Sequence, residues 1–138
     1  MPVTSASKTL KILVYSDDAN TRAAVMAALG TRPSAELPRV EYVEVATEPV
    51  VIRLMDEGGI DLAILDGEAA PAGGMGVCRQ LKDEIFNCPP VLVLTGRPED
   101  GWLATWCRAD AAVPQPIDPV LIAEAAATLL RRRVVAAS

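Results

Sequence analysis

The chain has 138 residues, the size of a single globular domain with room for a hydrophobic core. Hydrophobic residues make up 51% of it and charged residues 22%, and this composition excludes a disordered chain. The formal net charge is −5, from 13 Lys and Arg against 18 Asp and Glu, so we predict no nucleic-acid partner.

Strand-like and helix-like segments alternate along the chain. The predicted strands are 10–15, 40–46, 62–65, 91–94 and 111–113. The predicted helices are 20–29, 49–57, 75–84, 99–108 and 119–133. The last helix ends in Arg131, Arg132 and Arg133, which favour the negative end of a helix dipole. We interpret this short basic cluster as a solvated helix end.

This alternation is typical of a parallel sheet covered by helices on both faces. Apolar strands 10–15, 62–65 and 91–94 are expected at the centre of the sheet, and strands 40–46 and 111–113 at its edges. We predict an α/β fold: a flavodoxin-like, doubly wound, five-stranded parallel sheet of strand order 2-1-3-4-5.

The domain prediction follows from the same segments. Residues 1–9 are expected to be a flexible N-terminus, residues 10–133 one domain and residues 134–138 a C-terminal tail. No apolar stretch reaches the ~18 residues of a membrane span, and the N-terminus lacks the apolar core of a signal peptide. We therefore predict a cytoplasmic protein without a membrane span.

Cysteine usage agrees with that compartment. Cys78, Cys88 and Cys107 are odd in number and lack metal-binding spacing, and the chain contains no histidine. These features argue against a disulfide framework and against the usual zinc sites. Reduced thiols are the simplest interpretation.

Polar residues follow the three central strands. Asp17 and Asp18 come after the first, Asp66 after the third, and Thr95 after the fourth. Taken singly, each is equally well explained as a helix cap or turn residue. The carboxyl ends of parallel strands, however, open onto one crevice, and clustered carboxylates require a cation such as Mg²⁺. A carboxylate beside Mg²⁺ can attack a phosphoryl group, so the sequence predicts a phosphoryl-acceptor site.

The order and spacing of these motifs resemble the receiver domains of response regulators. The likeness spans roughly residues 10–132. Its motifs are Ile12 to Asp18 with Arg22, Asp61 to Asp66, Val77 to Lys82, Val91 to Thr95, and Ala109 to Pro119. In the same order, these five motifs match the family's first strand and helix, its phosphoacceptor strand, its third helix, its fourth strand, and its stretch that ends in Lys-Pro.

The resemblance implies a role for each site residue. Asp66 would accept a phosphoryl group from a histidine kinase, and Thr95 would hydrogen-bond a phosphoryl oxygen. Asp17, Asp66 and the backbone carbonyl of Glu68 would bind a weakly held Mg²⁺, with Asp18 as a further candidate ligand.

Several positions depart from the family pattern. Ser16 replaces the first acid of the family's acidic pair, Gln115 replaces its lysine, and Ala112 replaces its aromatic switch residue. Losing one acid and one lysine leaves the net charge of the empty pocket unchanged. A charge-assisted hydrogen bond contributes roughly 1.5–3 kcal/mol, however, and Gln115 offers only a neutral donor. Phosphotransfer is therefore expected to be slow, weak or absent.

These observations predict an atypical single-domain response regulator of a two-component phosphorelay, and not an enzyme. It would signal through a downstream protein or a homodimer, using the face from Glu99 to Arg133, where Trp102 or Trp106 is expected to reach the surface. The alternative is a phosphate-independent interaction module, or pseudo-receiver, on the same fold. An aspartyl-phosphate phosphatase is disfavoured because Gln115 replaces the catalytic lysine and no histidine is present.

Overall fold

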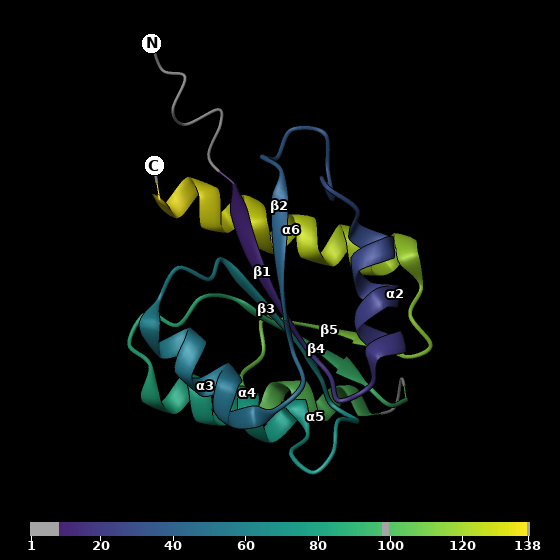
Figure 1. Ribbon diagram of the computed structural model, residues 1–138, viewed down its shortest axis with the longest axis vertical. Helices are drawn as coiled ribbons and strands as arrows, with labels where there is room; N and C mark the ends of the chain where they lie inside the picture. The colour runs from purple at the N-terminus through teal and green to yellow at the C-terminus, as the bar shows by residue number, and fades with distance from the viewer. Residues whose placement is uncertain (1–8, 98–99, 138) are drawn as a thin grey trace.

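The computed structural model describes residues 9–97 and 100–137 as a five-stranded parallel sheet between two helical layers (Figure 1). The strands are β1 (Leu10–Tyr15), β2 (Val40–Val45), β3 (Leu62–Asp66), β4 (Val91–Thr95) and β5 (Ala111–Pro114). The helices are α2 (Ala19–Leu29), α3 (Glu48–Glu57), α4 (Gly74–Glu84), α5 (Gly101–Trp106) and α6 (Pro119–Ala137). The strand order is β2-β1-β3-β4-β5, and all neighbours pair in parallel, which confirms the predicted fold.

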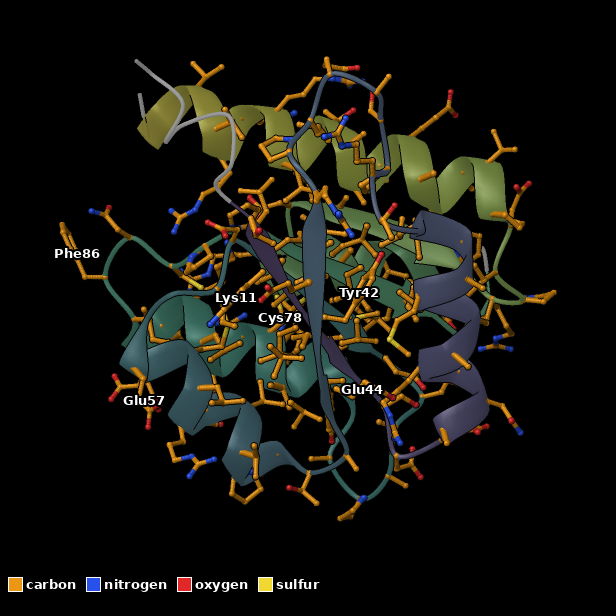
Figure 2. All side chains as sticks on the ribbon, turned by 45° about the horizontal axis from the view of Figure 1, so that its top comes forward. Lys11, Tyr42, Glu44, Glu57, Cys78 and Phe86 are labelled. Carbon is orange, nitrogen blue, oxygen red and sulfur yellow. The ribbon has the colours of Figure 1, made fainter. Side chains whose placement is uncertain are left out.

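Each face of the sheet has its own hydrophobic core (Figure 2). Ile12 and Val14 of β1 pack with residues of α2 and α6 on one face. Leu13 and Tyr15 of the same strand pack with residues of α3, α4 and α5 on the other face. Successive side chains of a strand point to opposite faces, so a sheet covered on both sides needs apolar residues throughout its central strands.

Local capping explains where two of the helices begin and end. Asp18 is the N-cap of α2, and its side chain accepts a hydrogen bond from the backbone N–H of Asn20. Helix α3 has Pro49 in its first turn and ends at Gly58, which adopts a φ of 87° that glycine tolerates well. Asp18 thus starts α2 soon after β1, and Gly58 ends α3 before β3.

Two helices differ in length from the prediction. Helix α5 ends at Trp106, and Arg108 has a φ of 63°, which breaks the helical path before the expected end. Pro98 and Glu99 lie outside the described residues. Helix α6 continues past the arginines to Ala137, because Val134 packs against the core and prolongs the buried stripe. Residues 134–137 are thus helical, whereas residues 1–8 lie outside the described chain.

Arg131, Arg132 and Arg133 lie within α6, whereas the prediction placed them at the end of the helix. Arg131 pairs with Glu36 in the loop before β2, and Arg133 pairs with Asp61 before β3 at 3.2 Å. These ion pairs connect α6 to the amino ends of two strands. Within the described residues, no helix is both long and apolar enough to cross a membrane.

Candidate functional site

Four side chains come together at the carboxyl edge of the sheet. In the strand register Asp66 lies opposite Leu94, and Thr95 lies opposite Pro114, the residue before Gln115. Ser16 follows the last residue of β1, which is the neighbour of β3. Among the described residues, the buried polar or charged ones are Ser16, Asp66 and Thr95, with 0%, 4% and 2% exposure. Polar residues are costly to bury without partners, so this concentration marks a specialised site.

The Asp66 carboxylate is held by hydrogen bonds from three neutral groups. Its Oδ2 accepts a bond from the Ser16 hydroxyl at 2.8 Å. Its Oδ1 accepts bonds from the Glu68 backbone N–H at 2.8 Å and from the Gln115 side-chain amide at 2.9 Å. A carboxylate oxygen offers two acceptor positions, so Oδ1 is saturated and Oδ2 keeps one free position.

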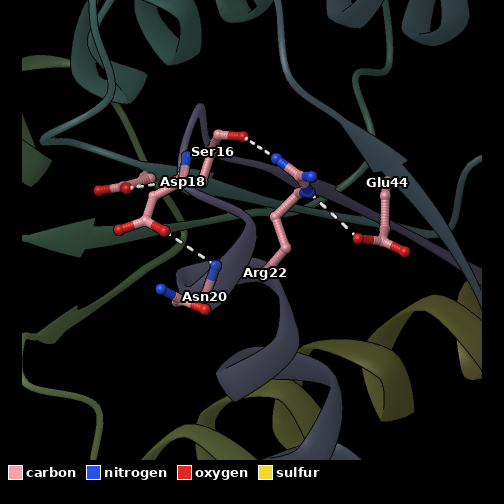
Figure 3. Close-up of polar contacts among 6 residues, drawn as sticks. Ser16, Asp18, Asn20, Arg22 and Glu44 are labelled. Atoms are coloured by element: carbon pink, nitrogen blue, oxygen red, sulfur yellow. Dashed lines mark hydrogen bonds and ion pairs between the residues drawn. The ribbon is translucent and has the colours of Figure 1, made fainter.

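Ser16 is itself fixed from several sides (Figure 3). Its hydroxyl oxygen accepts a bond from the backbone N–H of Asp18 at 3.0 Å, which leaves the hydroxyl proton directed at Asp66. Its carbonyl accepts a bond at 2.7 Å from Arg22, whose Nε also pairs with Glu44 at 3.1 Å. Arg22 therefore acts on the site indirectly, by holding the backbone that presents Ser16.

Replacing Arg22 with alanine should lower the free energy of unfolding by about 1–2 kcal/mol, because it removes a charged donor from a partly buried carbonyl. Replacing Glu44 with glutamine should cost less than about 0.5 kcal/mol, since that carboxylate is 48% exposed and its ion pair is screened. Urea denaturation of both variants measures the difference. Equal losses would mean that the ion pair, and not the bond to Ser16, carries the contribution of Arg22.

Two contacts from β1 and the residues after it anchor the loop between β3 and α4. The Asp17 carboxylate accepts a bond from the Ala70 backbone N–H at 3.2 Å. The Tyr15 hydroxyl donates to the Ala72 carbonyl at 2.6 Å. Burial raises the pKa of Tyr15, and the negative charges of Glu48, Asp17 and Asp66 raise it further, so the hydroxyl stays protonated and can donate. Tyr15 was not among the predicted site residues, because its only signal is that one aromatic residue ends an aliphatic strand.

The other predicted site residues have different surroundings. The Asp18 carboxylate caps α2. The exposed Glu68 side chain lies against Gly96, where an added Cβ would be 2.6 Å from the Glu68 Cδ. The Thr95 carbonyl accepts the Gln115 backbone N–H at 2.9 Å and so positions the start of the segment that carries the Gln115 amide.

The carboxylate oxygens at this edge suit a weakly held divalent cation. Across residues 9–97 and 100–137, no three Cys, Asp or Glu side chains group closely enough to hold a metal ion by themselves. Mg²⁺ in proteins is often held by one or two carboxylates, with water and phosphate oxygens completing its shell. Asp17 and Asp66 supply two carboxylates at one edge of the sheet, so the residues fit such a site.

The face formed by α5, β5 and α6 presents apolar side chains to solvent. Trp102 and Trp106 are 66% and 48% exposed, which confirms that at least one tryptophan reaches the surface. Val120 and Leu121 at the start of α6 are 68% and 43% exposed. Ala112, at the position of the family's aromatic switch residue, is also exposed on β5, and it offers no ring that could move. Glu99 lies outside the described residues.

The sheet order and the polar strand ends define a flavodoxin-like α/β domain of the receiver type. No family model matches the chain. It is 63% identical over 126 residues to uncharacterized response regulatory proteins of two Mycobacterium tuberculosis strains, CDC 1551 and H37Rv, covering 91% of this chain and 95% of each relative. The chain therefore belongs to the response regulator family.

Solved structures agree on the fold. A response regulator receiver domain from Clostridium thermocellum superposes with a TM-score of 0.75 at 21% identity, over 92% of this chain and 98% of that one. A CheY-like receiver domain from Methanospirillum hungatei gives a TM-score of 0.69 at 19% identity, over 91% of this chain and 97% of that one. At these identities the likeness establishes the architecture alone.

Proposed function

We propose that this receiver domain takes a phosphoryl group on Asp66 slowly and passes the signal on by protein contact. The observation that carries the proposal is the geometry of the Asp66 carboxylate. It lies at the carboxyl edge of the sheet, keeps 4% exposure, and has one acceptor position left on Oδ2. That free position is where Asp66 would attack phosphorus.

The hydrogen bonds to Asp66 explain why the reaction would be slow. The Gln115 amide and the Glu68 N–H orient the carboxylate through Oδ1, which favours a defined attack geometry. The Ser16 hydroxyl competes for Oδ2, the oxygen that must react. A transferred phosphoryl group also adds negative charge, and the neutral Gln115 amide stabilises it less than an ammonium would.

Two further residues complete the proposed site. The carboxylates of Asp17 and Asp66 with the backbone carbonyl of Glu68 would hold Mg²⁺. When bound, this ion would neutralise negative charge on the phosphoryl oxygens. Thr95, buried at the end of β4, would donate its hydroxyl to a phosphoryl oxygen.

The proposed partners follow from the family and from the exposed surface. A histidine kinase would be the phosphodonor in the cytoplasm, and the protein would be a signalling protein and not an enzyme. The output surface would be the α5–β5–α6 face with Trp102 and Trp106, which offers apolar area to a partner protein or a second copy.

Two observations favour a second function, a phosphate-independent interaction module. Asp66 already accepts three hydrogen bonds, so the site is satisfied without a phosphoryl group. The exposed Ala112 also removes the aromatic ring through which the family couples the site to its surface. In such a module the α5–β5–α6 face would be competent for binding at all times.

Incubation with acetyl phosphate and Mg²⁺ tests the proposal. We expect intact mass spectrometry to show a slow gain of about 80 Da, one phosphoryl group, on the wild-type protein. Asp66→Asn should abolish the gain, and Asp56→Asn, which changes an exposed carboxylate of α3, should leave it unchanged. A gain that persists in Asp66→Asn would refute the assignment of the acceptor. No gain in the wild type would favour the phosphate-independent module.

A further inference from the structure

Two buried cysteines are neighbours where α4 packs against the end of α5. Cys78 is on the inner side of α4, and Cys107 is the residue that ends α5. Both are 0% exposed and belong to the core between the sheet and its α3–α5 layer. Figure 2 shows Cys78 in the interior of the molecule.

The Cys78 thiol donates to the Cys107 carbonyl at 3.3 Å, and the Cys107 thiol donates to the Ala104 carbonyl at 3.4 Å. The sulfur of Cys107 is also 3.9 Å from the sulfur of Met75. No residue at the phosphoryl-acceptor site takes part in this cluster, so the proposed function leaves it unexplained.

Polar contacts around the thiols hold them in place. Arg79 donates to the Trp106 carbonyl at 2.8 Å, and its guanidinium lies 4.9 Å from the centre of the Trp106 ring. Arg108 pairs with Asp83, and Lys82 pairs with Asp110 at 2.7 Å. Side chains of α4 thus bind residues on both sides of Cys107, namely Trp106, Arg108 and Asp110. This arrangement holds Cys107 against the Cys78 thiol, and such confinement raises the effective concentration of the two thiols for each other.

We propose that Cys78 and Cys107 are a peroxide-sensitive dithiol that closes into a disulfide between α4 and the end of α5. The Cys78 thiol contacts Cys107 directly and both are buried, whereas Cys88 is partly exposed. The disulfide would fix the end of α5 beneath Trp102 and Trp106. Redox state would then act on the proposed output surface independently of Asp66.

The two thiols have different chemical roles. The neighbouring Cys78 thiol lowers the pKa of Cys107 to about 7, while the same neighbourhood and burial raise the pKa of Cys78. Cys107 therefore supplies the thiolate at neutral pH. It attacks one oxygen of hydrogen peroxide, hydroxide leaves, and a sulfenic acid forms. The Cys78 sulfur then displaces the sulfenic hydroxyl, so two thiols and one peroxide yield one disulfide and two waters.

Access to the buried pair requires local opening of α5. This helix has six residues, and helices of this length depend on tertiary contacts for their stability. Such elements open more readily than the core strands. We therefore expect oxidation to be slow in the folded protein but complete at equilibrium.

Mass spectrometry after treatment with hydrogen peroxide tests the proposal. The wild-type protein should lose about 2 Da, two hydrogen atoms, and then take up iodoacetamide at Cys88 alone when it is denatured. Proteolysis without reductant should yield one linked peptide pair that contains Cys78 and Cys107. Cys88→Ser should behave in the same way, and Cys78→Ser and Cys107→Ser should not lose mass.

Other products would overturn the proposal. A gain of oxygen atoms without crosslinking, or a linked peptide that contains Cys88, would show that the buried pair is not the reactive site. Because a serine in the core can impair folding, the linked peptide of the wild-type protein provides a readout that needs no variant. Asp66→Asn should also form the disulfide, which separates this test from that of the proposed function.

Discussion

Replacing Ser16 with aspartate and Gln115 with lysine in one chain should speed phosphorylation of Asp66 by acetyl phosphate roughly ten- to a hundredfold. The lysine would exchange a neutral donor to Oδ1 of Asp66 for a charged one. The aspartate would remove the hydroxyl that occupies Oδ2 and add a carboxylate for Mg²⁺. The initial rate of mass gain at fixed acetyl phosphate and Mg²⁺ measures the effect.

Each single replacement should give less than half of this increase in phosphorylation rate, measured on a logarithmic scale. Ser16→Asp alone puts a second carboxylate within hydrogen-bond range of Asp66, where the two repel each other without a cation. Gln115→Lys alone forms an ion pair with Asp66 and stabilises its unreacted state. The two positions are therefore coupled through one carboxylate. Additive rates in the double-mutant cycle, or an unchanged rate in the double variant, would contradict this account.

Replacing Gly74 with alanine should lower the free energy of unfolding by about 1–3 kcal/mol, because α4 packs directly on the backbone of the acceptor residue. An added Cβ would lie 2.7 Å from the Asp66 carbonyl oxygen and 2.9 Å from the carbonyl carbon of Leu65. Both contacts are with buried strand backbone, so the helix must shift. Asp66 phosphorylation should fall as well, since the shift moves the loop that donates to its carboxylate.

Gly76 provides the matched control, two residues further along the same helix. An added Cβ there meets nothing within 4 Å. Gly76→Ala should therefore stabilise the protein by roughly 0.5–1 kcal/mol, through the higher helix propensity of alanine. Chemical denaturation of both variants measures the contrast. Equal stability of the two would show that the contact between Gly74 and the strand backbone does not constrain the fold.

Much of the fold was predictable from the sequence, because it depends on local patterns. The alternation of apolar runs with helical segments, and the prolines and glycines between them, predicted every strand and helix to within a few residues at most ends. The strand order followed from which runs were wholly apolar. The prediction failed at the end of α5, where Arg108 turns left-handed in contact with Asp83 of α4.

The position of the site was also predictable, because adjacent parallel strands end at the same edge of a sheet. That rule brought Asp66 and Thr95 together before any geometry was known. The resemblance to receiver domains, and not this rule, identified Ser16 and Gln115 as departures from the family pattern. What it could not supply was the direction in which each side chain points.

Only the tertiary structure decided how these residues are connected. The bonds from Ser16 and Gln115 to Asp66 join residues 50 and 49 positions apart, and the Tyr15–Ala72 bond spans 57. The contact between the Cys78 thiol and the Cys107 carbonyl joins residues 29 positions apart. Local sequence patterns report burial and helix or strand periodicity, but a hydrogen bond depends on distance and angle between groups that only the packed sheet and helices bring together.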